Sequence, residues 1–323
     1  MKRFTCAVAL ALIAAAVAAQ EKYPSRAITV TVPNPPGGMN QITAQPLSAV
    51  IEKLYGQPAP VVNRPGGTAA VGTAYVANQK PDGYNILVTT PNIYLVYEKN
   101  RALNVEQPYQ LKQIQPIALT SADPLVLTVQ TESPHKSVKE FVAEAKAKDG
   151  QLAFSSSGPY AITHVPFAMF LEKAGLKMRH VPTTGGGPAV TQLLGGHVQA
   201  TGQGLAAVAP HVKGGKLRAL ASWGGKRHSS LPDVATFKEL GYDMEAYLWV
   251  GLFTTAGVAE PTFKAMRDMV RRVMNDATYQ QAMQKASVEV DYRDTPEFVQ
   301  FYEADHKRLG PVVERLAKDE GKK

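Results

Sequence analysis

Short apolar runs rich in β-branched residues alternate along the chain with longer segments whose apolar residues recur every three or four positions. The short runs predict strands at 27–32, 60–63, 85–90, 116–120, 124–130, 152–156, 178–182, 217–222 and 248–256. The amphipathic segments predict helices at 42–55, 69–79, 137–148, 161–175, 188–195, 205–214, 261–275, 278–286 and 295–318. Regular alternation of this kind is typical of an α/β fold with mainly parallel sheets.

The loop after the first strand, "PNPPGGMNQ" at 33–41, lacks strand and helix formers at its centre. Its prolines end the strand, and Gly37 and Gly38 permit positive φ and the close approach of a foreign atom. The amide groups at the start of the following helix favour an anion. An ordinary strand-to-helix turn also accounts for this loop taken alone.

Three more polar loops follow predicted strands, at 89–94, 155–164 and 183–190, and they are rich in Ser, Thr and Gly. In open α/β sheets, ligands bind at the carboxyl ends of the strands. Four such loops, divided between two parts of the chain, predict an anion site between two domains.

The first residues have the features of an export signal. "MKR" is a basic start, an apolar stretch follows, and "VAA" at 17–19 is a small-residue cleavage site. We therefore expect residues 1–19 to be a signal peptide that is cut near Ala19, and the mature protein to lie in the periplasm. The one cysteine, Cys6, leaves with the signal, so we expect no disulfide, thiolate metal ligand or thiol nucleophile.

A chain of 323 residues with 45% hydrophobic residues can bury a large core or two cores. We expect two lobes joined by crossing strands near 120–125 and 246–255, with 20–122 plus 250–323 as lobe 1 and 123–249 as lobe 2. The formal charge of +8 gives a mildly positive field that draws anions, and solubility alone also accounts for it. An exported protein has little access to nucleic acid, so we expect no nucleic-acid partner.

The motifs of common catalytic and metal sites are missing from the sequence. The seven histidines form no HxxxH or HExxH pattern, and GxSxG, GxGxxG and GxxxxGK[ST] do not occur. Ser156 or Ser157 with His164 could form a nucleophile and base, although N-capping explains serines before a helix better. We therefore expect no catalytic residue, metal or cofactor.

At this point the sequence resembles the Bug family, the periplasmic solute-binding proteins of tripartite tricarboxylate transporters. The resemblance covers essentially the whole mature chain, with "NRPGG" (63–67), "KPDGY" (80–84) and "LLGG" (193–196) as specific motifs. It implies an α/β, two-lobed periplasmic binding protein fold of type II with a ligand cleft between the lobes. It also implies a small carboxylate ligand, delivery to a membrane permease, and no catalysis.

The sequence departs from the family pattern at informative positions. Gln41 and Gln203 stand where acids are usual, and Pro159, Tyr160 and Ile162 replace small or hydroxyl residues. Replacing an acid by an amide relieves repulsion of an anion by roughly 4 kcal/mol at 4 Å for an effective dielectric of 20. It also removes a partner for a ligand ammonium. Drift at positions that never touch the ligand is the alternative.

We therefore expect a monomeric receptor for a carboxylate or dicarboxylate without an ammonium group, including an aromatic diacid such as terephthalate if Tyr160 covers its ring. A periplasmic serine hydrolase and a ligand sensor of the same fold stay open as alternatives. The predicted ligand-binding residues are Gly37, Gly38, Met39, Asn40, Gln41, Thr90, Asn92, Ser156, Ser157, Tyr160, His164, Thr184, Gly185, Gly186 and Gln203.

Overall fold

The computed structural model describes residues 23–320, so the predicted signal peptide and Cys6 lie outside the described residues. The strands are β1 (Thr29–Val32), β2 (Val61–Asn63), β3 (Asn85–Thr89), β4 (Ile114–Gln130), β5 (Ala153–Ser156), β6 (Arg179–Pro182), β7 (Ala200–Gly204), β8 (Leu217–Ser222), β9 (Tyr247–Thr255) and β10 (Val290–Asp294). The helices are α2 (Met39–Tyr55), α3 (Ala70–Ala77), α4 (Asn92–Ala102), α5 (Val138–Ala147), α6 (Val165–Ala174), α7 (Gly186–Leu194), α8 (Leu205–Lys213), α9 (Glu260–Met274), α10 (Ala277–Lys285) and α11 (Thr295–Glu320), with a 3₁₀ turn at Leu111–Gln113.

The strands form one sheet in the order β2-β1-β3-β9-β4-β7-β5-β6, with β8 and β10 also paired to β4. The two ends are parallel, where β1 pairs with β2 and β3, and β5 pairs with β6 and β7. The centre is antiparallel, because β4 runs away from the end that contains β1–β3 and β9 runs back beside it. The prediction of mainly parallel sheets is therefore wrong for the central strands.

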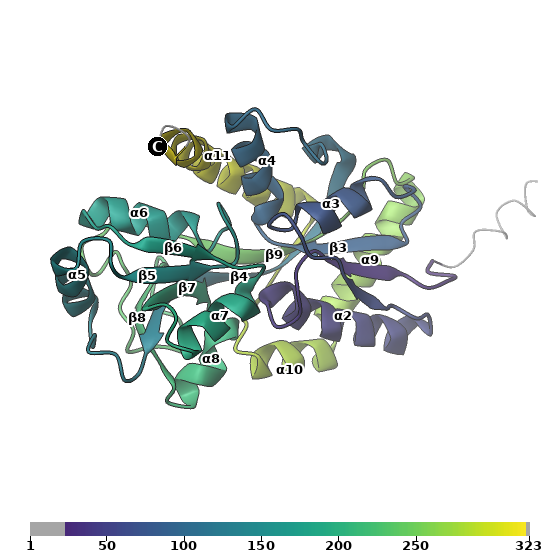
Figure 1. The fold of residues 1–323 in the computed structure, drawn as a ribbon. Helices are drawn as coiled ribbons and strands as arrows, with labels where there is room; N and C mark the ends of the chain where they lie inside the picture. Colours follow the sequence, from purple (N-terminus) through teal and green to yellow (C-terminus); the bar gives the residue numbers. More distant parts are fainter. Residues whose placement is uncertain (1–22, 321–323) are drawn as a thin grey trace, which may run out of the picture.

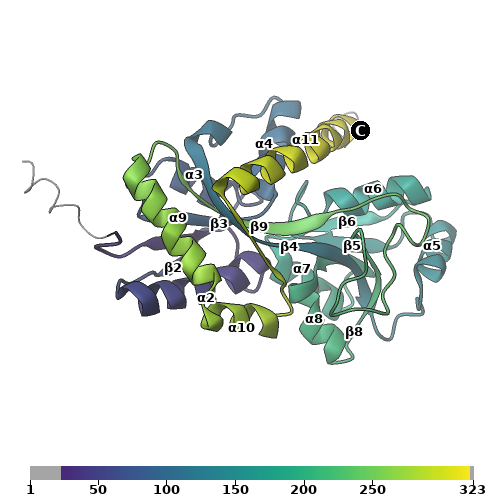
Figure 2. The same ribbon diagram turned by 180° about the vertical axis from the view of Figure 1, so that it is seen from behind.

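Each end of the sheet carries its own helices (Figures 1 and 2). We call β1–β3 and β10 with α2–α4 and α9–α11 the first lobe, and β5–β8 with α5–α8 the second lobe. The long strands β4 and β9 connect them. The first part of β4 pairs with β10, and its second part pairs with β7 and β8. The predicted lobe boundaries at 122/123 and 249/250 fall inside these two strands and stay a prediction.

Four elements differ from the sequence-based expectation. The predicted strands at 116–120 and 124–130 are one continuous strand, β4. β7, with the sequence ATGQG, was not predicted because it lacks the usual strand formers, yet all five of its residues are buried. α4 was not predicted because apolar residues cover more than one of its faces, and β10 was not predicted because its residues are only half-buried.

The longest helix, α11, is tied to the sheet by a buried carboxylate. Asp305 Oδ2 accepts hydrogen bonds from Trp249 Nε1 of β9 (2.7 Å) and from Tyr94 Oη of α4 (2.6 Å). These donors compensate the loss of water around the buried acid. From this anchor α11 extends toward α6 of the second lobe, as Figures 1 and 2 both show.

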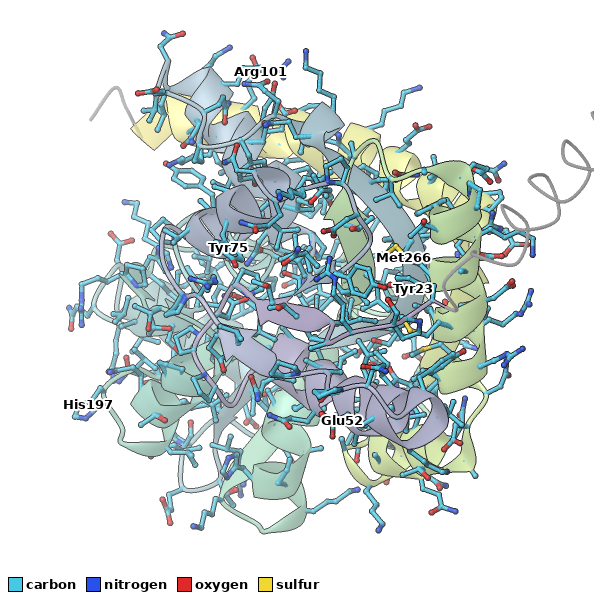
Figure 3. The ribbon with its side chains drawn as sticks, turned by 90° about the vertical axis from the view of Figure 1, so that its right-hand side faces the viewer. Tyr23, Glu52, Tyr75, Arg101, His197 and Met266 are labelled. Atoms are coloured by element: carbon cyan, nitrogen blue, oxygen red, sulfur yellow. The ribbon has the colours of Figure 1, made fainter. Side chains whose placement is uncertain are left out.

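The beginning of the described chain is fixed on the first lobe. Tyr23 Oη donates to the carbonyl of Gly83 (2.6 Å), and Met266 of α9 lies beside the same glycine (Figure 3). Across residues 23–320, no helix combines the length and the apolar character that crossing a bilayer requires.

Candidate functional site

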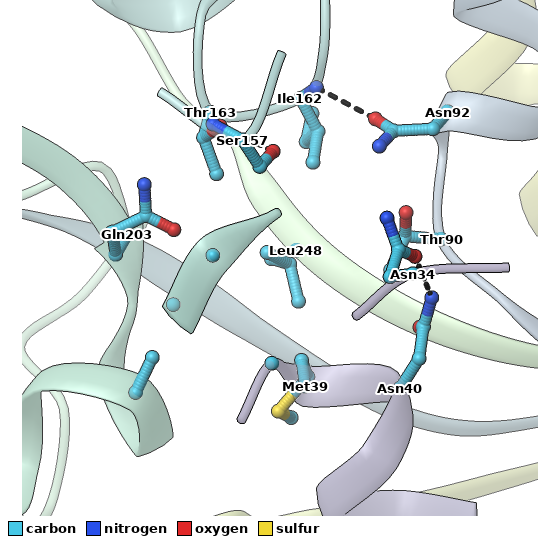
Figure 4. Close-up of a pocket in the computed structure, with 14 residues that line it drawn as sticks. Asn34, Met39, Asn40, Thr90, Asn92, Ser157, Ile162, Thr163, Gln203 and Leu248 are labelled. Carbon is cyan, nitrogen blue, oxygen red and sulfur yellow. Dashed lines mark hydrogen bonds between the residues drawn. The ribbon is translucent and has the colours of Figure 1, made fainter. Parts of the chain in front are cut away.

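A cavity of about 40 Å³ lies between the two lobes (Figure 4). Most of its lining comes from the loops that follow strands in both lobes and from the first turns of the next helices. The lining residues are Asn34, Gly38, Met39, Asn40, Thr90, Asn92, Ser157, Ile162, Thr163, Gly186, Gln203, Gly204, Ala207 and Leu248. The prediction that the strand-to-helix loops of both lobes converge therefore agrees with the observed geometry.

Four helices begin at this cavity. α2 begins at Met39, α4 at Asn92, α7 at Gly186 and α8 at Leu205, next to Gly204. No side chain caps any of the four; α3, α6 and α9 are also uncapped, while Ser137 caps α5 and Asp276 caps α10. Each helix amino end is equivalent to roughly half a positive charge. The cavity therefore lies in the positive field of these helix ends.

The polar side chains of the lining are amides and hydroxyls. Asn40 Nδ2 donates to Asn34 Oδ1 (2.7 Å) within the first lobe. In the second lobe, the Ser157 and Thr163 hydroxyls lie 2.7 Å apart. The lining, taken over residues 23–320, contains no Asp, Glu, Lys, Arg or His. A bound anion would meet neutral polar groups and helix ends, with no acidic side chain to repel it.

Residues 23–320 contain no group of three or more His, Cys, Asp or Glu side chains placed to hold a metal. Within the part of the chain that the structure describes, the cavity therefore offers hydrogen-bond donors for an organic anion and no ready metal ligands.

Several predicted site residues line the cavity, and the others lie outside the lining. Those in the lining are Gly38, Met39, Asn40, Thr90, Asn92, Ser157, Gly186 and Gln203. Those outside it are Gly37, Gln41, Ser156, Tyr160, His164, Thr184 and Gly185. Their roles in ligand binding stay a prediction.

Helix geometry explains the position of Gln41. It follows Asn40 in α2, so its side chain points about 100° away around the helix axis. Its Oε1 accepts a hydrogen bond from Asn63 Nδ2 (2.9 Å). Thr184 is exposed. Gly185 touches the other lobe, where a Cβ atom on it would come 3.1 Å from Pro35.

The serine and histidine pair proposed for a hydrolase has a different arrangement from the one that the sequence suggested. Ser156 Oγ lies 2.7 Å from His180 Nε2, while Ser157 pairs with Thr163. His164 accepts the backbone N–H of Tyr160 at Nδ1 (3.0 Å) and stacks on His180 with ring centroids 3.9 Å apart. Burial lowers the pKa of His164 to about 4, so it is neutral at neutral pH.

The prediction did not include six residues of the lining: Asn34, Ile162, Thr163, Gly204, Ala207 and Leu248. Asn34, Ile162 and Thr163 belong to the polar loops that the sequence singled out, so these loops supply more of the lining than the predicted residues alone. Leu248 comes from the crossing strand β9, and the continuous apolar run of this strand gives no sign of a ligand.

Comparison with known proteins gives consistent matches. The model of the tripartite tricarboxylate transporter family receptor matches residues 43–317. Protein BugT of Bordetella pertussis is 32% identical over 281 residues, which are 86% of this chain and 84% of BugT.

Solved structures share the fold. The periplasmic binding protein BugD is 26% identical with a TM-score of 0.80, covering 93% of this chain and 99% of BugD. The protein Rpa4515 of R. palustris, solved with adipate, has a TM-score of 0.85 at 24% identity, covering 90% of this chain and 97% of its own. The predicted α/β, two-lobed periplasmic binding protein fold and the family resemblance are confirmed, and this chain belongs to the receptor family of the tripartite tricarboxylate transporters.

Proposed function

We propose that this protein is a periplasmic receptor that encloses a small carboxylate, and in particular a dicarboxylate without an ammonium group, between its lobes. The observation that supports this most is the convergence of four uncapped helix amino ends on a cavity without charged side chains. Such a site stabilises negative charge through fixed dipoles and N–H donors. It offers no carboxylate to pair with an amine.

The cavity is smaller than both an aliphatic and an aromatic diacid, so either ligand must widen it. A water needs at least roughly 10–15 Å³ of such space, so 40 Å³ admits about three waters. A flexible diacid needs less separation of the lobes than a rigid aromatic ring does. The proposal of terephthalate depended on Tyr160, which does not line the cavity, so this ligand becomes the less favoured candidate. The relative solved with adipate supports the aliphatic class.

We further propose that the receptor is a monomer without enzymatic activity that delivers its ligand to a membrane permease. Family membership supports this role. The hydroxyls of Ser156 and Ser157 hydrogen-bond to partners other than His164, which argues against His164 as the base of a hydrolase. A ligand sensor would use the same closure, and a growth defect on the ligand as carbon source would favour transport.

The test is calorimetry of the mature protein with adipate, citrate, terephthalate, aspartate and glutamate. We expect an aliphatic acid without an ammonium group to bind most tightly and terephthalate to bind more weakly. At 100 times its Kd, the bound acid should raise the free energy of unfolding by about 2.7 kcal/mol.

Two outcomes would overturn the proposal. Tighter binding of aspartate or glutamate than of every other acid would contradict the charge argument. Turnover of any acid, or stoichiometric labelling of a serine by a fluorophosphonate, would support the hydrolase instead.

A further inference from the structure

One hydrogen bond joins the two lobes at the wall of the cavity. Asn92 Oδ1, at the start of α4, accepts from the backbone N–H of Ile162 in the second lobe at 2.9 Å (Figure 4). The two residues are only 3% and 1% exposed. Water therefore competes little for this bond, and it forms only when the lobes are together.

This bond fixes which way the Asn92 amide faces. A backbone N–H can only donate, so the side-chain oxygen must face Ile162 and the NH₂ group must face the other way. Figure 4 shows this nitrogen directed toward the space enclosed by the lining residues. Within residues 23–320, no acceptor takes a hydrogen bond from Asn92 Nδ2. Two amide donors are therefore available toward the cavity.

The N–H of Ile162 is itself held in place by its loop. Thr163 Oγ1 accepts the backbone N–H of Ser157 (2.8 Å), and the Ala161 N–H donates to the Gly158 carbonyl (3.3 Å). On the other side, Asn92 begins a helix in which the N–H of Ile93 donates to the Thr90 carbonyl (3.1 Å). Both ends of the interlobe bond are thus set by local backbone structure.

We propose that Asn92 is a specificity-determining residue that donates to a ligand acceptor, and that lobe closure orients it through the N–H of Ile162. When the lobes separate, the amide loses this bond and can turn either end toward the cavity. In the closed protein it presents only donors, so it donates to a carboxylate oxygen and offers no acceptor to an ammonium group. The inference rests on the proposed function and adds the residue that couples ligand charge to closure.

Three variants separate the two roles of the side chain. Asn92→Asp keeps an acceptor for the Ile162 N–H and replaces the NH₂ donors by a charged oxygen. Asn92→Ala removes both. Asn40→Asp places the same charge in the same cavity, but Asn40 bonds to Asn34 within its own lobe, so it leaves the interlobe bond intact. Circular dichroism verifies that each variant is folded.

The first measurement is small-angle scattering without added acid. We expect Asn92→Ala to have a larger radius of gyration than the wild type, and Asn92→Asp a radius no larger than that of the wild type. Asn40→Asp should match the wild type, because it leaves the interlobe bond intact. Equal radii for the wild type, Asn92→Ala and Asn92→Asp would overturn the claim that this bond holds the lobes together.

The second measurement is calorimetry with adipate and aspartate. Loss of a hydrogen bond to a charged group should weaken adipate binding by Asn92→Ala at least about tenfold. We compare the factor by which each variant lowers the ratio of adipate affinity to aspartate affinity. This factor should be at least about tenfold larger for Asn92→Asp than for Asn92→Ala. Unchanged adipate affinity in Asn92→Ala would overturn the inference. If the wild type binds neither acid, the proposed function fails instead, and the scattering result still decides the role of the interlobe bond.

Discussion

Gln41 and Gln203 stand at positions where the family resemblance led us to expect acids, but their surroundings differ. Gln203 is 1% exposed and lines the cavity, and its Nε2 donates to Thr201 Oγ1 (3.2 Å). A Cβ atom added to Gly186, at the start of α7, would lie 3.1 Å from Gln203 Oε1. Gln41 bonds to Asn63 outside the lining. The charge argument therefore applies to Gln203 far more than to Gln41.

Replacing each glutamine by glutamate tests this difference with nearly equal side-chain volumes. Gln203→Glu should weaken adipate binding by about 1–3 kcal/mol, because an uncompensated charge then faces the anion. Gln41→Glu keeps an acceptor for Asn63 and should change the affinity by less than about threefold, because distance and solvent reduce the repulsion. Calorimetry at neutral pH measures both. An equal loss in the two variants would contradict the different positions of the two side chains.

At the scale of elements, α11 packs against β9 at a glycine, Gly251. A Cβ atom on Gly251 would come 2.3 Å from the Phe298 ring of α11 and 2.9 Å from Phe253. Phe298 is fully buried, so its ring has no room to move away. The absence of a side chain at position 251 therefore sets how closely the helix approaches the crossing strand.

We expect Gly251→Ala to lower the free energy of unfolding by about 1–3 kcal/mol, the usual cost of overpacking a core. Urea denaturation measures the loss. Trimming the ring that would clash should recover part of it, so Gly251→Ala with Phe298→Leu should be more stable than the sum of the two single changes predicts. Simple additivity of the two changes would show that α11 does not clash with the new methyl group.

At the scale of the whole molecule, the two lobes share two crossing strands and a set of contacts that can open. Arg315 of α11 pairs with Glu172 of α6 (2.7 Å), but both side chains are about half exposed. Exposed pairs of this kind contribute about 0–1 kcal/mol each. Lys213 of α8 also donates to Ser287 (2.9 Å). Such contacts favour the closed arrangement without fixing it.

We therefore expect the radius of gyration of the wild type to be smaller with saturating adipate than without it, with bending near 120–125 and 246–255. Small-angle scattering of the same sample before and after addition measures the change. A protein that binds adipate by calorimetry but gives superimposable scattering curves would contradict closure around the ligand.

The sequence by itself determined the elements and the loops that matter. Its apolar periods predicted most strands and helices within a few residues, because burial of one face leaves a local pattern. The glycine, serine and proline loops were recognisable because backbone conformation depends on those residues. The family resemblance came from ordered motifs along the chain and was confirmed by the family match.

Only the tertiary structure decided which side chains of those loops meet. Asn92 and Ile162 are 70 positions apart, and their bond depends on both lobes being folded and together. Leu248 reaches the cavity because β9 crosses between the lobes, while Gln41 turns away because it is one residue further along α2 than Asn40. Which face of a helix meets the cavity, and which residues meet across the cleft, are set by packing between elements that are far apart in the sequence. Such packing leaves no local pattern in the sequence, so the loops could be predicted while the lining could not.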